Sequence, residues 1–266
     1  MKTMKFYTVL VSGSLLVLSM VSCRKNPVTP VEPVPVAGKL TKLEYKDGAY
    51  DSIYYNSQGL ISKIVNHYVV PFPYNEIHQF EYDANNKVTR ISDNNGETYE
   101  YKYIAGRLEA VLHFSAGVKE DYRFYEYQNG KLSLVEEYFR LGINAPGYQL
   151  SSKLEYFYYA DGNLKQEMSY SFDPQTMAPI KDFSIEHLDY DGKVNPTDPI
   201  SRFLYLYQVP MASKNVGRLI TKDERSGIST EYTFAYTYNN AGNPVTKKMT
   251  YISGGQPVEE TIKYYY

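Results

Sequence analysis

The stretch Thr98-Tyr99-Glu100-Tyr101-Lys102-Tyr103-Ile104-Ala105-Gly106-Arg107-Leu108 decides the fold class of this chain. Its three tyrosines alternate with Thr98, Glu100 and Lys102, so they fall on one face of an extended segment and the polar side chains fall on the other. Gly106 then supplies the positive φ that a tight hairpin turn requires, and the apolar Leu108 follows in a second extended run. The stretch therefore predicts a β-hairpin with one aromatic face.

The same pattern recurs along the chain as a tyrosine, a polar turn with Gly or Asn, and then apolar residues. Copies begin at Tyr55, Tyr82, Tyr103, Tyr127, Tyr159, Tyr190 and Tyr238. Their turns are unevenly spaced, which indicates a degenerate repeat with loop insertions. No segment after Pro35 shows a convincing helical period with caps. We therefore predict an all-β protein, an antiparallel meander of repeated Tyr-rich β-hairpins that forms a barrel-like or strongly curved single sheet over residues 39–266.

The two ends of this region look like complementary halves of one repeat unit. Residues 38–43 (Gly-Lys-Leu-Thr-Lys-Leu) are similar to the second half of a unit, and residues 261–266 (Thr-Ile-Lys-Tyr-Tyr-Tyr) to the first half. If the first and last strands pair, they close the sheet and remove both exposed edges. An open, curved meander is the competing geometry.

Composition narrows the class of protein further. The 266 residues include 30 Tyr, 11 Phe and no Trp, and tyrosine favours pleated, half-buried surfaces. The 28 Lys and Arg nearly balance the 30 Asp and Glu, which argues against a nucleic-acid binder. Since Cys23 is the one cysteine, a disulfide within the chain and a cysteine metal site are both excluded.

The N-terminus has the features of an export signal. A positively charged start precedes an apolar stretch from Phe6 to Val21, which is too short and wrongly flanked for a membrane-spanning helix. Met20-Val21-Ser22-Cys23 resembles the bacterial lipobox, with Met in place of the usual Leu. We therefore predict a lipoprotein signal peptide over residues 1–22 and a lipid anchor on Cys23. A plain signal peptide with an incidental cysteine is the alternative.

Residues 23–38 are rich in proline and predict an extended tether between the lipid and the β domain. Arg24-Lys25 stands where an Asp would resemble an inner-membrane retention signal, so we expect the outer membrane. Glu32 is the only acid of the tether. Because the acidic tract of surface-exported lipoproteins is missing, we expect the periplasmic face, with the cell surface as the alternative.

The repeat units resemble the YD repeats of Rhs-type proteins, in a looser form. Tyr190-Asp191-Gly192-Lys193-Val194-Asn195-Pro196, followed by Ser213-Lys214-Asn215-Val216, is similar to a stretch of the envelope lipoproteins grouped as domain of unknown function 4595. The second Asn of that stretch is missing here. The resemblance covers about residues 39 to 266. It implies a porin-like, barrel-like antiparallel fold and supplies no activity.

Two sets of aromatic residues are candidates for contact with a ligand. The apolar stretch 69–74 carries Phe72 and Tyr74 at a hairpin tip, which either marks a contact surface or folds over an open barrel end. Tyr99 and Tyr101 lie on an aromatic face that either stacks on sugar rings or fills the interior of a wide sheet. The partners we expect are a glycan or an envelope protein, and no nucleic acid.

No nucleophile elbow, phosphate loop, HExxH or dinucleotide fingerprint occurs in the sequence, so we predict no catalytic residue, no metal site and no cofactor. Asp189-Tyr190-Asp191-Gly192 has alternate carboxylates as in a calcium loop, but it lacks the further EF-hand ligands and fits an ordinary Asp-Gly turn. His67 and His78 would face each other across a hairpin centred on Phe72, as half of a zinc or copper site. No third ligand is indicated.

The leading function is therefore a non-catalytic envelope lipoprotein with a binding or scaffold role. One alternative is a hydrolase with scattered carboxylates, such as Glu136-Glu137 or Glu259-Glu260. Another is an integral outer-membrane β-barrel, because the C-terminal strand ends in alternating apolar residues and Tyr266. The faces are tyrosine rather than aliphatic, which disfavours this last alternative.

A water-facing barrel predicts which side chains point outward. We expect exposed charges at Glu100, Lys102, Arg123 and Lys263, and buried aromatic rings at Tyr99, Tyr101, Phe124, Phe234 and Tyr236.

Replacement of Cys23 by Ala tests the lipid anchor. The variant should leave the precursor uncleaved by lipoprotein signal peptidase and release any processed protein from membranes, because the acyl chains supply the membrane affinity. Phase partitioning in detergent measures this. If the Cys23→Ala protein partitions like the parent, the anchor lies elsewhere.

Overall fold

The computed structural model describes residues 38–142, 147–173, 175–198, 200 and 203–266. All described residues belong to one compact unit within residues 33–266. The predicted signal peptide, Cys23 and the tether up to residue 37 lie outside the described residues.

Sixteen antiparallel strands form one closed barrel in which each strand pairs with its neighbour in sequence. This confirms the predicted all-β meander and selects the closed barrel over the open sheet. The strands are β1 (Lys42–Tyr45), β2 (Tyr50–Tyr55), β3 (Ile61–Tyr68), β4 (Tyr74–Tyr82), β5 (Val88–Asp93), β6 (Glu97–Ile104), β7 (Arg107–Ser115), β8 (Val118–Gln128), β9 (Lys131–Arg140), β10 (Tyr148–Tyr158), β11 (Leu164–Phe172), β12 (Pro179–Leu188), β13 (Arg218–Asp223), β14 (Ser229–Tyr238), β15 (Pro244–Ser253) and β16 (Gln256–Tyr265).

The barrel closes where its first and last strands meet. β1 pairs with β16 from Lys42 opposite Tyr265 to Tyr45 opposite Ile262. Across this seam Lys263 lies 2.8 Å from Glu44, and its hydrogen bond to Glu44, together with that of Lys42, lowers the pKa of the Glu44 carboxyl to about 2. Pairing of the two ends leaves the described sheet without an unpaired edge strand.

The repeated turns lie together at one end of the barrel, which we call the repeat rim: the turns after β2, β4, β6, β8, β10 and β14. Asn or Asp caps several of them; the Asp83 side chain, for example, accepts the backbone N–H groups of Asn85 and Lys87. Gly130 has a φ of 80° at its hairpin tip, as the sequence predicts. The turns after β1, β3, β5, β7, β9, β11, β13 and β15 form the opposite rim.

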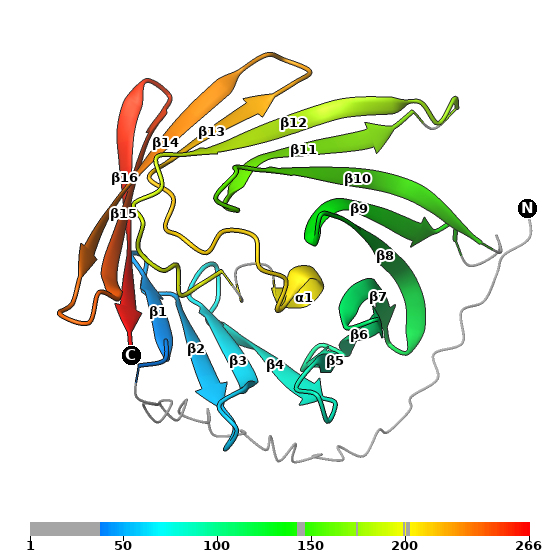
Figure 1. Ribbon diagram of the computed structural model, residues 1–266, viewed down its shortest axis with the longest axis horizontal. Coiled ribbons are helices and arrows are strands. Elements are labelled where there is room, and N and C mark those ends of the chain that lie inside the picture. Colours follow the sequence, from blue (N-terminus) through cyan, green and yellow to red (C-terminus); the bar gives the residue numbers. More distant parts are fainter. Residues whose placement is uncertain (1–37, 143–146, 174, 199, 201–202) are drawn as a thin grey trace, which may run out of the picture. The chain divides into compact units, whose positions relative to one another are not determined.

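The chain between β12 and β13, residues 189–217, starts at the rim, where Gly192 and Val194 are exposed. Its later described residues, which include the short helix α1 (Phe203–Leu206), lie inside the barrel (Figure 1). We call this segment the plug. Its buried side chains join those of the strands in one hydrophobic core. Tyrosine hydroxyls from the wall bind it: Tyr101 and Tyr125 donate to the backbone oxygens of Leu204 and Tyr205, and Tyr82 bonds the hydroxyl of Tyr207. The sequence prediction of strands alone missed this segment.

On β8, the side chains of Arg123 and Phe124 point in the opposite directions to those predicted from the sequence. Arg123 points into the barrel, because its partners across the sheet are Val111 and Glu137 on the inward face. Phe124 is consequently on the outer surface, 43% exposed. The other outward charges are only partly as expected, since Lys102 and Lys263 are exposed but Glu100 is half-buried. Phe234 and Tyr236 are mostly buried, as predicted, although neither is completely covered.

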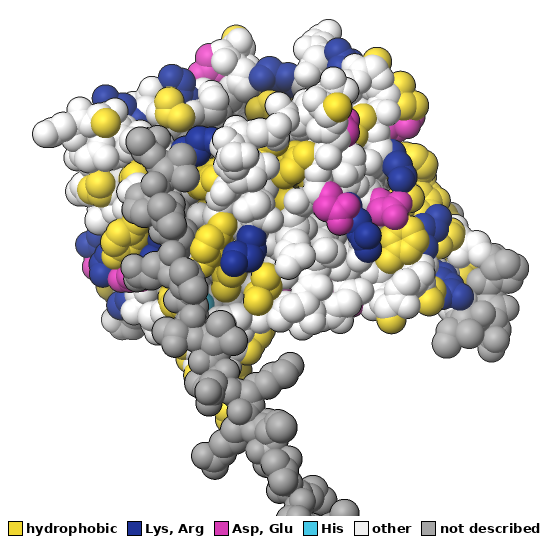
Figure 2. Space-filling model, turned by 90° about the horizontal axis from the view of Figure 1, so that it is seen from below, with side chains coloured by type: hydrophobic (Ala, Val, Ile, Leu, Met, Phe, Trp, Pro, Cys, Tyr) yellow, Lys and Arg dark blue, Asp and Glu magenta, His cyan; other side chains and the backbone are white. Residues whose placement is uncertain are grey.

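The outer wall carries charged and hydrophobic side chains together, as Figure 2 shows for one face. β14 illustrates the alternation: its exposed side chains are Ser229, Glu231, Thr233, Ala235 and Thr237, and its half-buried ones include four aromatic rings. Among the described residues there is no helix with the length and apolar character that crossing a membrane requires.

The packing of the inward face predicts a large difference between two isoleucines. Ile91 is fully buried on β5, whereas Ile104 is exposed at the end of β6. Ile91→Ala should lower the free energy of unfolding by about 2–5 kcal/mol through lost burial and a new cavity. Ile104→Ala should change it by no more than about 0.5 kcal/mol. Urea unfolding measures both, and equal effects would contradict the inward orientation of Ile91.

Candidate functional site

The interior of the barrel has two different halves along its axis. Toward the repeat rim it is filled by the plug and by apolar side chains of the strands. Toward the opposite rim, the inward positions carry charged and polar groups, among them Glu97, His113, Asp121, Glu137 and Asp51. Buried polar groups of this kind require partners, and their contacts show which of them serve the fold and which remain open to a ligand.

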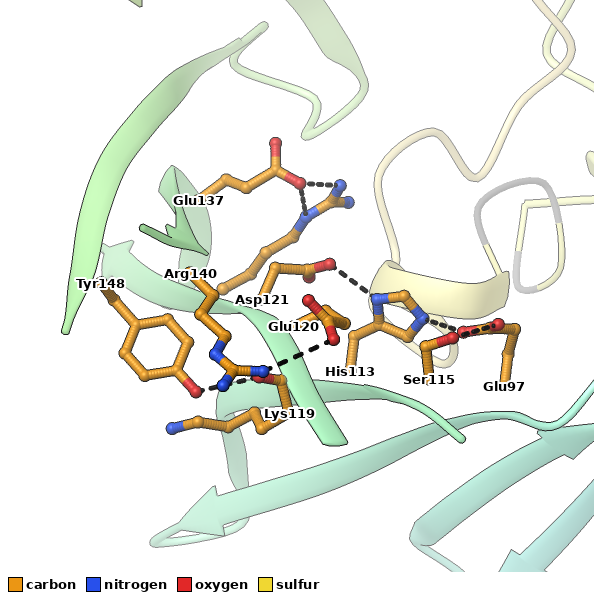
Figure 3. A network of polar contacts seen from close by, with 10 residues as sticks. Glu97, His113, Ser115, Lys119, Glu120, Asp121, Glu137, Arg140 and Tyr148 are labelled. Carbon is orange, nitrogen blue, oxygen red and sulfur yellow. Dashed lines mark hydrogen bonds and ion pairs between the residues drawn. The ribbon is translucent and has the colours of Figure 1, made fainter. Parts of the chain in front are cut away.

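A network of polar side chains lies on the inward face of β6, β7 and β8, near the opposite rim (Figure 3). The His113 ring lies between two carboxylates, with Nδ1 2.6 Å from Asp121 and Nε2 2.7 Å from Glu97. Ser115 donates to the other oxygen of Glu97 at 2.8 Å. Tyr99 stacks on the imidazole with ring centroids 4.6 Å apart. The two carboxylates thus hold both ring nitrogens of His113, and Tyr99 covers one face of the ring.

A second group links the wall to the plug. Arg123 donates to Glu137 at 2.6 Å, and Ser152 donates to the same carboxylate at 2.8 Å. The guanidinium also lies over the ring of Tyr205 in the plug, 3.2 Å from its centroid. A cation that is paired and stacked in this way fastens the plug to β8 and β9. This group therefore has a structural role.

The pKa values of the two groups agree with that role. Burial by itself lowers the pKa of His113, but its hydrogen bonds to Asp121 and Glu97 outweigh burial and raise the pKa above its ordinary value. Burial by itself raises the pKa of Glu137, but Arg123 outweighs it and the pKa is lowered. Both shifts favour the charged form of the group, and a carboxyl whose pKa is lowered, as at Glu137, is poorly suited to act as a general acid.

The other polar part of this half is a funnel between β1–β3 and β15–β16. Its outer part is a cavity of ≈ 760 Å³ at the opposite rim, lined by side chains that include Lys46, His67, Tyr68 and Glu260. An inner cavity of ≈ 280 Å³ continues it toward Lys247 and Ile200 of the plug. Four residues line both cavities, so the two form one passage into the barrel: Tyr45, Asp51, Asn66 and Ile262.

The funnel wall presents fixed hydrogen-bonding groups. Asp51 accepts from the Tyr45 hydroxyl and from the Asn66 amide, both at 2.6 Å. Deeper inside, the Lys247 amine lies over the ring of Phe234, 4.2 Å from the centroid. Burial lowers the pKa of Lys247 to about 8. A carboxylate, an amide and an amine thus line a passage whose remaining lining includes aromatic and aliphatic side chains.

Aromatic rings stand at the mouth of this funnel. Tyr68, which lines the outer cavity, stacks on Tyr74 with centroids 4.6 Å apart. Tyr74 is 53% exposed and Phe72, in the loop between β3 and β4, is 78% exposed. His67 stacks on Tyr50 at 4.6 Å. Of the predicted ligand-contact residues, Phe72 and Tyr74 are therefore accessible, and Tyr74 contacts a ring that lines the cavity.

Tyr99 and Tyr101 are not available as ligand contacts, contrary to that part of the sequence prediction. Their exposed fractions are 7% and 3%, and they pack in the hydrophobic core. The physical reason is the plug, which occupies the space that their ring faces would otherwise offer. Their alternation with charged residues indicated an inward direction, but the sequence pattern carried no sign of what fills the interior.

The predicted pairing of His67 with His78 is wrong. In the register of β3 and β4, His78 lies opposite Ile64, and His67 lies opposite Asn75 and contacts its side-chain oxygen at 2.7 Å. The structure instead brings His78 beside Glu76 and Asp93, with one ligand atom of each within 4.8 Å of the others. Burial lowers the pKa of His78. This cluster is missed by sequence reasoning because Asp93 comes from the next strand.

The carboxylates around Asp189 accept hydrogen bonds in a turn, from β13 and within the plug. Asp191 accepts the backbone N–H of Lys193 at 2.8 Å, as an Asp-Gly turn requires. Asp189 pairs with Arg218 at 2.9 Å, and Asp198 accepts the backbone N–H of Ala212 at 2.7 Å. Their oxygens are thus used within the fold.

The acid pairs proposed for a hydrolase do not form pairs. Glu136 and Glu137 are adjacent on β9, and Glu259 and Glu260 are adjacent on β16, so each pair points to opposite faces of the sheet. Glu259 instead lies 2.7 Å from Lys248. Two carboxylates on opposite faces of one strand cannot act on the same bond.

Comparison with solved structures finds porin-like proteins from Bacteroides. A porin-like protein from Bacteroides uniformis superposes with a TM-score of 0.60 at 17% sequence identity, covering 85% of this chain and 97% of that one. A porin-like protein from Bacteroides vulgatus gives 0.49 at 12% identity, covering 86% and 98%. No protein-family model matches the chain, and the search of curated proteins found no match.

The Bacteroides uniformis likeness shows a porin-like fold, as the family resemblance implied. At this identity it shows the fold alone. Membership in the lipoprotein family of domain of unknown function 4595 stays a prediction, and the function has to be argued from the site.

The position of His113 between two carboxylates predicts a pH-dependent contribution to stability. Because its pKa is raised in the folded state, the contribution is fully present below the ordinary histidine pKa of about 6.5 and is lost as the pH rises through the raised value. The stability advantage of the parent over His113→Gln should therefore shrink between mildly acidic and alkaline pH. Urea unfolding across this range measures it.

His67→Gln is the matched control, since His67 contacts an amide oxygen and not a carboxylate. Its difference from the parent should vary less with pH than that of the His113 variant. An advantage of His113 that grows toward alkaline pH would contradict the two-carboxylate arrangement.

Proposed function

We propose that this protein is a non-catalytic outer-membrane lipoprotein whose barrel stands in water and binds a saccharide in the funnel. The anchor is Cys23, and the periplasmic face is its location. The observation that carries the binding role is the funnel itself, a polar and aromatic passage at the end of the barrel that the plug leaves open.

The outer wall supports a barrel in water rather than one in lipid. A transmembrane barrel presents an apolar band about 25 Å tall to the bilayer, and a Lys or Arg at its midplane costs about 2–4 kcal/mol. The outward side chains of β14 include Glu231 and three hydroxyl residues, and Lys102 is exposed on β6. The interior, in contrast, holds the hydrophobic core. The outer faces of β14 and β6 are thus more polar than the lipid-facing band of a transmembrane barrel.

The chemistry of the funnel favours a saccharide. Sugar rings have apolar faces that stack on aromatic rings. Tyr68 lines the outer cavity, Tyr74 stacks on it, and Phe72 is exposed in the loop of the same hairpin. Sugar hydroxyls need donors and acceptors fixed in place, which Asp51 and Asn66 supply deeper in the wall. The outer cavity of ≈ 760 Å³ lies within the usual range of small-molecule sites, about 300–1,000 Å³.

The pKa values of the carboxyl groups support binding without catalysis. Glycoside hydrolysis needs one carboxylic acid with a raised pKa. Among the described residues, every Asp or Glu whose pKa clearly departs from its ordinary value has a lowered pKa, as at Glu44, Glu155 and Glu224. In the funnel itself, Asp51 accepts hydrogen bonds from Tyr45 and Asn66 and is placed to orient the hydroxyl groups of a ligand.

A glycan array probed with the full-length protein in detergent tests the proposal. The parent should bind a defined set of saccharides, and Asp51→Asn and Tyr68→Ala should each weaken that binding by about tenfold or more, because they remove a charged acceptor and a stacking ring. Phe157→Ala is the control, since Phe157 is an exposed ring on the outer face of β10 away from the funnel.

The control variant should bind like the parent. The proposal is contradicted if no saccharide binds, or if the two funnel variants bind as tightly as the control. Binding that is lost only in the Phe157 variant would place the ligand on the outer wall.

A further inference from the structure

We propose that Glu76, His78 and Asp93 bind a divalent transition-metal ion of the zinc type inside the barrel. Each residue offers one ligand atom, and the three atoms lie within 4.8 Å of one another. The Nε2 atom of His78 is 3.7 Å from Oε1 of Glu76. The proposal does not rest on the saccharide role, because its three ligand residues lie on β4 and β5 and none of them lines the funnel cavities.

The barrel register brings these residues together. Glu76 and His78 are two positions apart on β4, so their side chains share the inward face. Asp93, the last residue of β5, lies directly opposite His78 across the β4–β5 ladder. Directly opposed positions have Cβ atoms about 4.5–5.5 Å apart, close enough for their side chains to reach one ion.

Two of the three ligands are held in place by other groups. The Oδ1 atom of Asp93 accepts the backbone N–H groups of Asn95 and Glu97, at 2.8 and 2.9 Å, in the turn after β5. The Tyr68 hydroxyl donates to Oε2 of Glu76 at 3.2 Å. Hydrogen bonds that orient ligating carboxylates in this way are a usual feature of metal sites.

A separate observation comes from Asn66 on the neighbouring strand β3. It lies opposite Glu76 across the β3–β4 ladder and is 9% exposed. Its amide nitrogen donates to Asp51 at 2.6 Å, whereas its Oδ1 atom is buried without a hydrogen-bond partner among the described residues. An unsatisfied buried acceptor costs about 1–3 kcal/mol. A metal ion, or a water bound to it, beside Glu76 would satisfy this oxygen.

The ligand set selects the class of ion. Imidazole nitrogen with carboxylate oxygens suits zinc and similar transition metals, whereas calcium and magnesium prefer oxygen ligands alone. Zinc binds these atoms at about 2.0–2.2 Å, so two ligand atoms of a tetrahedral site lie about 3.3–3.6 Å apart. The ligand atoms, which lie within 4.8 Å of one another, would therefore move together by up to about 1.5 Å when an ion binds. Three protein ligands also leave a fourth position for water or Asn66.

Access to the cluster comes from the funnel. Asn66 and Tyr68 both line its outer cavity. Asn66 lies opposite Glu76 in the β3–β4 ladder, and the Tyr68 hydroxyl donates a hydrogen bond to Glu76. The Glu76 side chain is itself 25% exposed. An ion can therefore reach the cluster without opening the barrel wall.

Zinc binding by the full-length protein in detergent, after treatment with a chelator, tests the proposal. Calorimetric titration with Zn²⁺ alone should give one tight site per chain, confirmed by metal analysis after dialysis. Glu76→Gln and Asp93→Asn should each weaken that site by at least about tenfold, because each removes a charged ligand. Asn at position 93 keeps an oxygen for the turn, and position 76 is partly exposed, so both variants should fold.

His67→Gln is the control, because it removes a nearby histidine that lies outside the cluster. It should bind zinc like the parent. The proposal is overturned if the parent takes up no stoichiometric zinc, if it binds calcium in preference to zinc, or if Glu76→Gln and Asp93→Asn bind zinc as tightly as His67→Gln. Circular dichroism of each variant establishes that a lost site is not a lost fold.

Discussion

A closed ring of sixteen strands is too wide for its own side chains to fill, and the rest of this structure depends on that constraint. Barrels of about eight strands are filled by their side chains, whereas those of 16 to 18 strands leave a channel. This barrel meets the constraint with its own chain: residues 189–217 enter from the repeat rim and occupy that half of the interior. Strand closure and plug packing together form one hydrophobic core.

The tyrosine repeat is well suited to this geometry. A tyrosine has an apolar body that packs in the core and a hydroxyl at its tip that can meet a backbone oxygen. Tyr101 and Tyr125 use both ends, since each is buried and each donates to the backbone of the plug. Because the plug is irregular, its backbone polar groups need partners from elsewhere, and the wall tyrosines supply several of them. Satisfied polar contacts thus allow an irregular segment to lie inside a barrel.

The half of the interior toward the opposite rim is less completely filled, and its cavities leave room for a ligand. There the network around His113 and Arg123 is paired within the protein, whereas the funnel from the rim to Lys247 is open. The saccharide role and the metal cluster are both proposed for this half. They would use different strands, the funnel mainly β1–β3 and β16, the cluster β4 and β5.

The strands and their turns could be predicted from sequence, because alternation and turn residues are local signals. Pairing of the end segments was only one of two geometries that the sequence allowed, and the register of β1 with β16 decides it. The plug could not, since its only trace is a long interval without alternation after Tyr190. That omission also explains two errors. Tyr101 was offered as a ligand contact, but the plug covers it. Phe124 was expected inside, but no local signal indicated that its neighbour Arg123 would face inward onto a ring of the plug. The cluster at His78 was missed because strand register decides it.

Mapping of tyrosine reactivity by chemical modification and mass spectrometry tests the division of the interior most directly. In the native full-length protein, Tyr74 at the funnel mouth should react readily, whereas Tyr101, Tyr125 and Tyr207 around the plug should react only on unfolding. The account predicts this contrast because the plug excludes reagent from the repeat-rim half. Modification of Tyr101 and Tyr125 at the rate of Tyr74 would show that the plug does not fill the barrel.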